Sequence, residues 1–177
     1  GFIKGHMCSP AIATQAEDLI AGGVKELIHV GYAGGLQPEL VPGEIILTDG
    51  AFNDTAVAKL YGYDYELIRS SKDLTNKIEE MITSAEIPYK RGLHWTTDAG
   101  YRETWGQVMD YRDKGALCVE MEGVGLFTIA NYRKCVATGI YVVSDVYSEN
   151  DWKLGWEGND IKRAVGDVID MIIESIS

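Results

Sequence analysis

The chain has 177 residues, 46% of them hydrophobic and 24% charged, and its formal net charge is -11 at pH 7. A chain of this length can bury one hydrophobic core, so disorder, a collagen repeat and a small disulfide-dependent scaffold are excluded. No stretch approaches the ~20 consecutive apolar residues that cross a bilayer, and no secretory leader is recognisable. The acidic balance, without a block of Lys or Arg, argues against nucleic acid or a membrane surface as a partner. We therefore expect a single cytoplasmic domain over residues 1–177.

The cysteines and histidines form no recognisable motif. No two cysteines form a C-x-x-C pair, and no histidine stands near one at a zinc-binding spacing. We therefore expect reduced thiols and no bound metal. The residues are Cys8, Cys118, Cys135, His6, His29 and His94.

Helices and strands alternate along the chain. Ser9-Pro10 supplies an N-cap and a first-turn proline, and Gly22-Gly23 ends the helix that they begin. A short strand over 26–30 then enters a glycine-rich turn over 31–35. This succession predicts a three-layer α/β domain, with helices on both faces of a parallel or mixed sheet. The later apolar patterns predict strands over 44–48, 93–97, 116–121 and 139–144, and helices over 74–85, 124–132 and 161–176.

Two carboxylates stand at the end of one predicted strand, where Glu120-Met121-Glu122 precedes Gly123. Alternation along a strand sends both glutamate side chains to one side and Met121 to the other. A carboxylate that points into a cleft can accept two hydrogen bonds from a vicinal diol, such as that of ribose. A solvated pair at a strand end is an equally good interpretation.

An aspartate follows the apolar strand over 139–144. Partial burial of Asp145 at this place would raise its pKa and suit it to general acid catalysis. Capping of the following turn is the alternative role.

A further polar loop follows the strand over 93–97. It contains Tyr101 and Arg102, with Thr97 beside it at the strand end, and the guanidinium of Arg102 could hold an anion or a base carbonyl. An ion pair with a neighbouring carboxylate would explain Arg102 equally well. The loop tryptophans Trp105, Trp152 and Trp156 suit a lid, a wall on which a base stacks, or an oligomer interface.

Two glycine-containing segments are candidate anion sites. The loop over 5–8 leads into the first helix, whose free N–H groups attract anions. Gly31-x-x-Gly34-Gly35 allows close approach of the backbone to a ligand, although it lacks the G-x-G-x-x-G spacing. A plain N-cap and a tight turn are the simpler interpretations.

Together these residues resemble the nucleoside phosphorylases of the purine and uridine phosphorylase type, a family that also includes nucleosidases that cleave with water. The resemblance implies a three-layer α/β/α fold with a central mixed, partly barrel-like sheet. It also implies upstream strands with a glycine loop and a phosphate-binding arginine, which are not in this sequence. The matching segments are Val30–Leu36 with Pro42–Ile45, Thr97–Tyr101, Val119–Glu122 and Val143–Asp145.

The resemblance also implies roles for individual residues. Asp145 would be catalytic and would protonate the purine ring nitrogen as the glycosidic bond breaks. Glu122 would bind the ribose hydroxyls and Met121 would pack on the sugar. The implied substrate-binding residues are Glu120, Met121, Glu122, Tyr101, Arg102 and Thr97, and the implied phosphate-binding residues are His29, Gly31 and Tyr32.

The activity implied by the resemblance is that of a pentosyltransferase in nucleoside salvage. It would cleave the N-glycosidic bond of a nucleoside, with a purine base favoured, and give free base and ribose 1-phosphate. Inorganic phosphate would be the co-substrate, with no cofactor and no metal. The family also implies a homo-oligomer, either a dimer, a trimer or a hexamer.

Several departures from the family pattern fall on the phosphate side. His29 replaces an arginine, Tyr32 replaces Ser or Thr, and Ala11 replaces a serine. A neutral histidine does not supply the permanent charge of a guanidinium. In addition, Gly100 stands where the family has a base-stacking Phe. Two alternatives therefore stay open: a phosphate-independent nucleosidase, and a non-catalytic nucleoside-binding or storage member of the fold.

Overall fold

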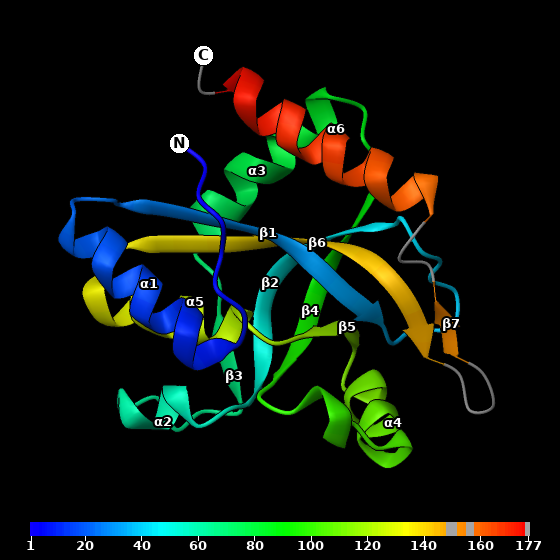
Figure 1. Ribbon diagram of the computed structural model, residues 1–177, viewed down its shortest axis with the longest axis horizontal. Coiled ribbons are helices and arrows are strands. Elements are labelled where there is room, and N and C mark those ends of the chain that lie inside the picture. Colours follow the sequence, from blue (N-terminus) through cyan, green and yellow to red (C-terminus); the bar gives the residue numbers. More distant parts are fainter. Residues whose placement is uncertain (148–151, 155–157, 176–177) are drawn as a thin grey trace.

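A computed structural model describes residues 1–147, 152–154 and 158–175, with the backbone alone for 152–154. In these residues the strands form one mixed sheet in the order β3-β2-β4-β5-β1-β6-β7. An additional antiparallel pairing joins β2 to β6, and it closes the five strands β2, β4, β5, β1 and β6 into a barrel (Figure 1). The predicted mixed, partly barrel-like sheet is thus confirmed. The strands are β1 Glu26–Gly35, β2 Ile45–Asp54, β3 Leu67–Arg69, β4 Tyr89–Thr97, β5 Ala116–Glu120, β6 Val136–Tyr147 and β7 Trp152–Leu154.

Helices cover the barrel on opposite sides. In Figure 1, α3 and α6 lie together at the top, whereas α1 and α5 lie together on the other side of β1 and β6. Each pair buries an apolar face against the barrel, and such burial is the main favourable term in folding. The helices are α1 Ser9–Ala21, α2 Val57–Leu60, α3 Lys72–Ser84, α4 Trp105–Asp113, α5 Gly123–Arg133 and α6 Asn159–Ser175, and η1 Gly100–Arg102 is a 3-10 turn.

The start of α1 and the start of α5 are in direct contact. A Cβ atom at Gly125 would lie 2.5 Å from the carbonyl oxygen of Ser9, so only glycine allows this approach. Ile12 of α1 and Phe127 of α5 belong to the same buried cluster. The packing brings the residues just before each helix to one place, where the candidate site lies.

The glycine-rich segment over 31–35 is not the predicted turn. It continues β1, and Gly31 to Gly35 pair in parallel with β6 from Tyr141 to Val146. The glycines serve close packing instead: a Cβ atom at Gly34 would lie 2.7 Å from Cε2 of Tyr147. A local pattern of glycines does not distinguish a turn from a strand that other chains approach closely.

Some elements have no counterpart in the sequence prediction. They are α2, β3, α4, η1 and β7, all of which are short, and β2 also continues beyond residue 48 to Asp54. The predicted loop position of Trp105 is wrong, because Trp105 begins α4 and packs against a buried cluster. Among the described residues, no helix combines the length and the apolar character needed to span a bilayer.

Candidate active site

The acidic turn Glu120-Met121-Glu122 joins the end of β5 to the start of α5. The start of α1 packs against this turn: Ser9 Oγ donates to the carbonyl oxygen of Met121 at 2.9 Å, and the N–H of Cys8 donates to Glu122 Oε1 at 2.6 Å. These two hydrogen bonds join residues that are 112 and 114 positions apart in the sequence. The Glu122 carboxylate lies between the starts of two helices, where backbone N–H groups favour a negative charge.

Cys8 holds an unusual backbone conformation at this contact. Its φ of 72° and ψ of 151° fall in a region that only glycine adopts without strain. Its carbonyl oxygen accepts the N–H groups of Ala11 and Ile12, while its own N–H reaches Glu122. Backbone strain of this kind concentrates at binding and catalytic sites, so it marks this junction as a functional candidate.

Glu122 has a pKa raised from its ordinary value of 4.5 to about 7. Burial is the main cause and the negative charge of Glu120 adds to it, while hydrogen bonds from the N–H groups of Cys8 and Met121 act in the opposite direction. Near neutral pH the carboxyl group can therefore either accept from or donate to a ligand hydroxyl.

Glu120 is 5% exposed, and both of its carboxylate oxygens already have donors within the protein. Oε1 contacts Thr96 Oγ1 at 2.5 Å and His94 Nε2 at 3.0 Å. Oε2 accepts the N–H groups of Glu122 at 2.8 Å and Gly123 at 2.7 Å. Glu120 therefore stands beside the implied sugar-binding residues, but its carboxylate is directed into the barrel.

Asp145 lies on β6 and is 4% exposed. Its Oδ1 accepts from Ser144 Oγ at 2.5 Å, and a Cβ atom at its register partner Gly34 would lie 3.3 Å from Oδ2. The ring of Tyr147, two residues after Asp145, lies against the same side of Gly34, 2.7 Å from where a Cβ atom would be. The predicted general acid is thus a buried group at the end of a barrel strand.

A second acid lies next to Asp145. Tyr147 Oη donates to Glu103 Oε2 at 2.7 Å. Burial raises the pKa of Glu103, the bond from Tyr147 lowers it, and the nearby charge of Asp145 raises it further. A Cβ atom at Gly100 would lie 3.5 Å from Glu103 Oε1 and 3.8 Å from Met121 Sδ. These contacts link the acidic turn to Asp145 around Gly100, the position where the resemblance implies a base-stacking Phe.

Sequence reasoning missed Glu103, Tyr147 and the buried His94. A usable signal for Glu103 was present: Thr104 and Gln107 form a capping box at the start of α4, and this fixes the chain immediately after Glu103. Tyr147 and His94 gave no local signal, because their partners Glu103 and Thr48 lie 44 and 46 residues away in the sequence.

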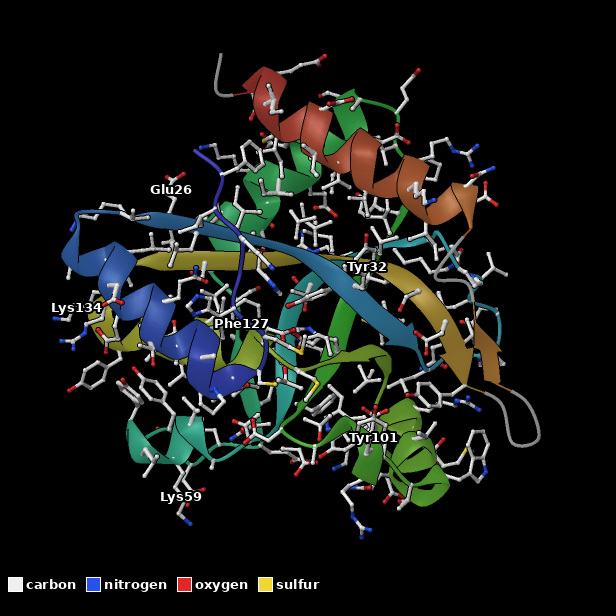
Figure 2. All side chains as sticks on the ribbon, viewed as in Figure 1. Glu26, Tyr32, Lys59, Tyr101, Phe127 and Lys134 are labelled. Carbon is white, nitrogen blue, oxygen red and sulfur yellow. The ribbon has the colours of Figure 1, made fainter. Side chains whose placement is uncertain are left out.

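Three implied substrate-binding residues are not part of this cluster. Tyr101 is fully exposed, and Figure 2 places it beside α4 and away from Tyr32. Arg102 is also exposed. Thr97 is 4% exposed, and its hydroxyl contacts Asp54 Oδ2 and the N–H of Ala99. Trp156 and the side chain of Trp152, both expected in a lid or stacking wall, lie outside the described residues.

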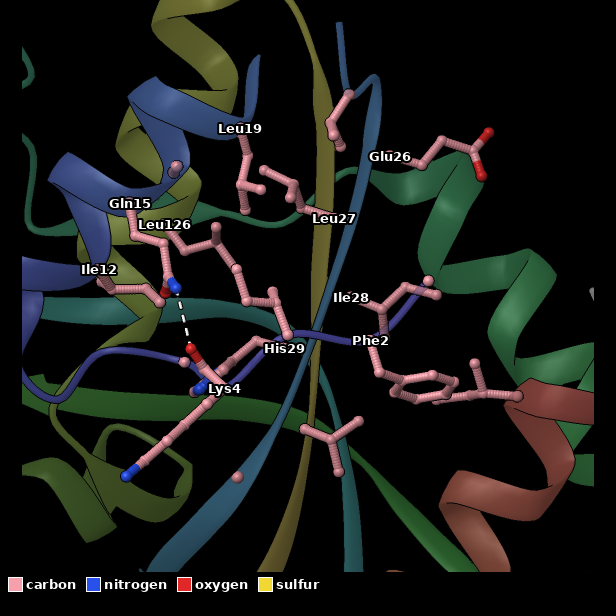
Figure 3. A pocket seen from close by; sticks show the side chains of 18 of the residues that line it. Phe2, Lys4, Ile12, Gln15, Leu19, Glu26, Leu27, Ile28, His29 and Leu126 are labelled. Atoms are coloured by element: carbon pink, nitrogen blue, oxygen red, sulfur yellow. Dashed lines mark hydrogen bonds between the residues drawn. The ribbon is translucent and has the colours of Figure 1, made fainter. Parts of the chain in front are cut away.

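The implied phosphate residues lie elsewhere. His29, Gly31 and Tyr32 line a cavity of ≈ 560 Å³ between the first residues of the chain, α1, β1 and α6, and neither Glu122 nor Asp145 lines it (Figure 3). Most of its other lining side chains are apolar. The side chain of Gln15 lines one side of this cavity, where its Nε2 donates to the carbonyl oxygen of Lys4 at 2.9 Å.

His29 is only partly buried as a residue, but its Nδ1 atom is buried without a hydrogen-bond partner among the described residues. Burial lowers the pKa of the imidazole, Glu120 acts in the opposite direction, and His94 lowers it further. The ring is therefore neutral at neutral pH. His29 therefore does not bring the permanent charge of an arginine, and among the described residues Lys4 is the basic residue that lines this cavity.

The closed mixed barrel with helices on opposite sides defines an α/β protein. An acidic turn precedes one of these helices, and a buried aspartate lies on a barrel strand. The chain belongs to the Phosphorylase superfamily, whose sequence profile matches residues 3–174. The family expected from the four motifs is thereby confirmed.

Two relatives are identical to this chain at about a third of the aligned residues. A protein of Exiguobacterium sibiricum named "Purine nucleoside phosphorylase DeoD-type" is 32% identical over 139 residues, which cover 77% of this chain and 59% of that protein. A protein of the same name from Caldanaerobacter subterraneus subsp. tengcongensis is 33% identical over 156 residues, with coverage of 82% and 67%. The chain thus spans about three-fifths to two-thirds of the length of these curated relatives.

A solved structure shares the fold. It is described as the P knowlesi homolog of P falciparum PNP, and it superposes with a TM-score of 0.78 at 22% identity over 93% of this chain and 66% of the other. The agreement in fold extends over nearly all of the chain.

Proposed function

We propose that the protein is a purine nucleoside phosphorylase in which this chain carries the sugar-binding and base-protonating residues. The observation that carries the proposal is the Glu122 carboxylate, held between the starts of α1 and α5 by the N–H of Cys8 at 2.6 Å. A carboxylate fixed in this way can accept hydrogen bonds from the two hydroxyls of a ribose. The names of the relatives from Exiguobacterium and Caldanaerobacter support the assignment.

In the proposed reaction a phosphate oxygen forms a bond to C1′ of the ribose while the bond from C1′ to the purine nitrogen breaks. The electron pair of that bond goes to the purine, which takes a proton at a ring nitrogen from Asp145. A purine anion is a poor leaving group, so proton donation lowers the barrier. Asp145 regains a proton from the phosphate or from solvent, and the products are free base and ribose 1-phosphate.

The test is release of free base from inosine, adenosine and uridine by the purified protein, with and without phosphate. Phosphate-dependent release from the purine nucleosides alone is the expected result. No release from any of the three would overturn the proposal, and faster release from uridine would overturn the purine preference.

A second candidate is a nucleosidase that uses water. The neutral, partly buried His29 at the position of the family arginine favours it. Release of free base at the same rate without phosphate, accompanied by ribose and not by ribose 1-phosphate, would establish this alternative. Nucleoside binding in a calorimetric titration, without any turnover, would instead indicate a binding or storage protein.

A further inference from the structure

A polar cluster fills the interior of the barrel beneath the acidic turn. It contains side chains from four strands, and each residue is at most 5% exposed. A carboxylate in such a place is costly unless charged or polar partners surround it. The members are Thr48 of β2, His94 and Thr96 of β4, Glu120 of β5 and Tyr141 of β6.

The carboxylate of Glu120 connects this cluster to α5. One oxygen contacts His94 Nε2 at 3.0 Å, while the other accepts the N–H groups of Glu122 and Gly123. Burial alone would raise the pKa of Glu120. His94 lowers this pKa through charge attraction and a hydrogen bond, and His29 and Thr96 add smaller contributions, so that the pKa falls below its ordinary value. Glu120 is therefore a charged group that orients two backbone amides of the turn.

His94 also contacts the helix start directly. A Cβ atom at Gly123 would lie 2.4 Å from His94 Nε2 and 3.0 Å from the hydroxyl of Tyr141, so the backbone of α5 lies against the imidazole. Since a carboxylate only accepts, Nε2 carries the hydrogen in the contact with Glu120. Nδ1 contacts Thr48 Oγ1 at 2.6 Å, which holds the plane of the ring.

We propose that His94 is a positioning residue for nucleoside binding, because through Glu120 it fixes the turn that presents Met121 and Glu122 to the sugar. The inference rests on the proposed function. In this proposal His94 and Glu120 act through the turn and not on the ligand itself, because both are at most 5% exposed and both oxygens of Glu120 have donors within the protein. Without the imidazole the carboxylate loses its main partner in the barrel and no longer holds the amides of Glu122 and Gly123 in one place.

The test compares His94→Leu, which removes the donor at similar volume, with His94→Gln, which keeps an N–H near the position of Nε2. We expect the leucine variant to raise KM for the nucleoside about tenfold or more while kcat changes less than threefold, because the lost hydrogen bond involves a charged group. The glutamine variant should restore KM to within about threefold of wild type. Equal KM values for the two variants, or a fall in kcat alone, would overturn the proposal.

Amide hydrogen exchange gives a readout that does not depend on activity. The amides of Glu122 and Gly123 should exchange at least about tenfold faster in His94→Leu than in His94→Gln. Equal exchange in both variants overturns the positioning role. If the wild type neither turns over nor binds a nucleoside, the proposed function is overturned instead. Failure of the positioning role and failure of the proposed function are therefore distinguishable.

Thr48→Val and Thr128→Val form a milder matched pair for the case in which His94→Leu does not fold. Thr128 is equally buried on α5, and its hydroxyl has no hydrogen-bond partner among the described residues. Thr48→Val should raise KM and the Gly123 exchange rate two- to fivefold, whereas Thr128→Val should leave both unchanged. Equal values in both variants would contradict the role of His94.

Discussion

The sugar side and the phosphate side of the proposed site differ in how their polar groups are held. On the sugar side, Glu120 and Glu122 accept hydrogen bonds from backbone N–H groups of two helix starts. On the phosphate side, Nδ1 of His29 has no partner among the described residues, and the neighbouring cavity has mostly apolar walls. A binding site is preorganised only where its polar groups are oriented by partners of their own. The described residues therefore fix the carboxylates of Glu120 and Glu122 through hydrogen bonds, whereas the ring of His29 has no such anchor at Nδ1.

The largest expected effect is loss of the general acid. Asp145→Asn should lower kcat by about 10²- to 10⁴-fold, because the purine then leaves without a proton, while the Kd for the nucleoside changes less than about threefold. Steady-state kinetics and calorimetric titration measure the two quantities. An equal effect on turnover and affinity would contradict the role of an acid. Glu39→Gln, at an exposed carboxylate, controls for the loss of one negative charge.

Glu122→Gln tests the sugar side directly. We expect nucleoside affinity to fall about tenfold, because the amide cannot accept two hydrogen bonds from a diol while it also binds the N–H of Cys8. Affinity for the free base should stay unchanged, since the base lacks the sugar. Calorimetry with a nucleoside and its base compares the two. Equal weakening of both ligands would show that Glu122 does not read the ribose.

The raised pKa of Glu122 predicts how stability depends on pH. An unfolded glutamate loses its proton near pH 4.5, whereas the folded carboxyl keeps it up to about pH 7. The folded state binds more protons in this window, so its stability falls as the pH rises from 4.5 to 7. Glu122→Gln removes this penalty. The difference in the free energy of unfolding, variant minus wild type, should therefore be ~1 to 3 kcal/mol larger at pH 8 than at pH 5. Urea unfolding at both pH values measures the difference, and a constant difference would contradict the shifted pKa.

The smallest effect is expected on the phosphate side. His29→Gln should change KM for phosphate less than about threefold at pH 7.5, because a neutral imidazole contributes no charge for an amide to replace. Initial rates at saturating nucleoside measure this constant. A loss of tenfold or more would show that His29 is a phosphate ligand, and would remove the contrast between the two sides. His6→Gln, at an exposed histidine, is the matched control.

Much of the fold follows from local patterns. The apolar stripe that includes Ile161, Val168 and Ile172 predicts α6, and these residues are buried against the barrel as expected. The helix α4 was missed because Val108 is its only buried residue, so its sequence lacks an apolar stripe. The glycines of β1 were misread as a turn because their close neighbours, Tyr147 among them, lie far along the chain.

The site could be located from sequence only in part. Glu122 lies two residues after β5, at the N-cap of α5, and Asp145 lies near the end of β6, and the roles given to them remain proposals. The family resemblance groups Thr97, Tyr101 and Arg102 with them because the three residues are at the end of another strand or follow it. Tyr101 and Arg102 nevertheless face solvent, and Thr97 bonds to its own loop and to Asp54. Proximity in sequence after a strand does not specify on which side of the chain a side chain lies.

The sequence by itself determined the alternation of helices and strands and the family, because these depend on residues within a few positions of one another. The predicted N-cap Ser9 is wrong, because Cys8 holds that position and the Ser9 hydroxyl donates to Met121 instead. The tertiary structure decided the closure of the barrel through the pairing of β2 with β6, the contact of His94 with Thr48, 46 residues away, and that of Glu122 with Cys8, 114 residues away. Burial and charge at these contacts shift the pKa values of Glu120 and Glu122 in opposite directions. The physical reason is that the environment of a carboxylate is set by distant segments that reach it only when the chain folds.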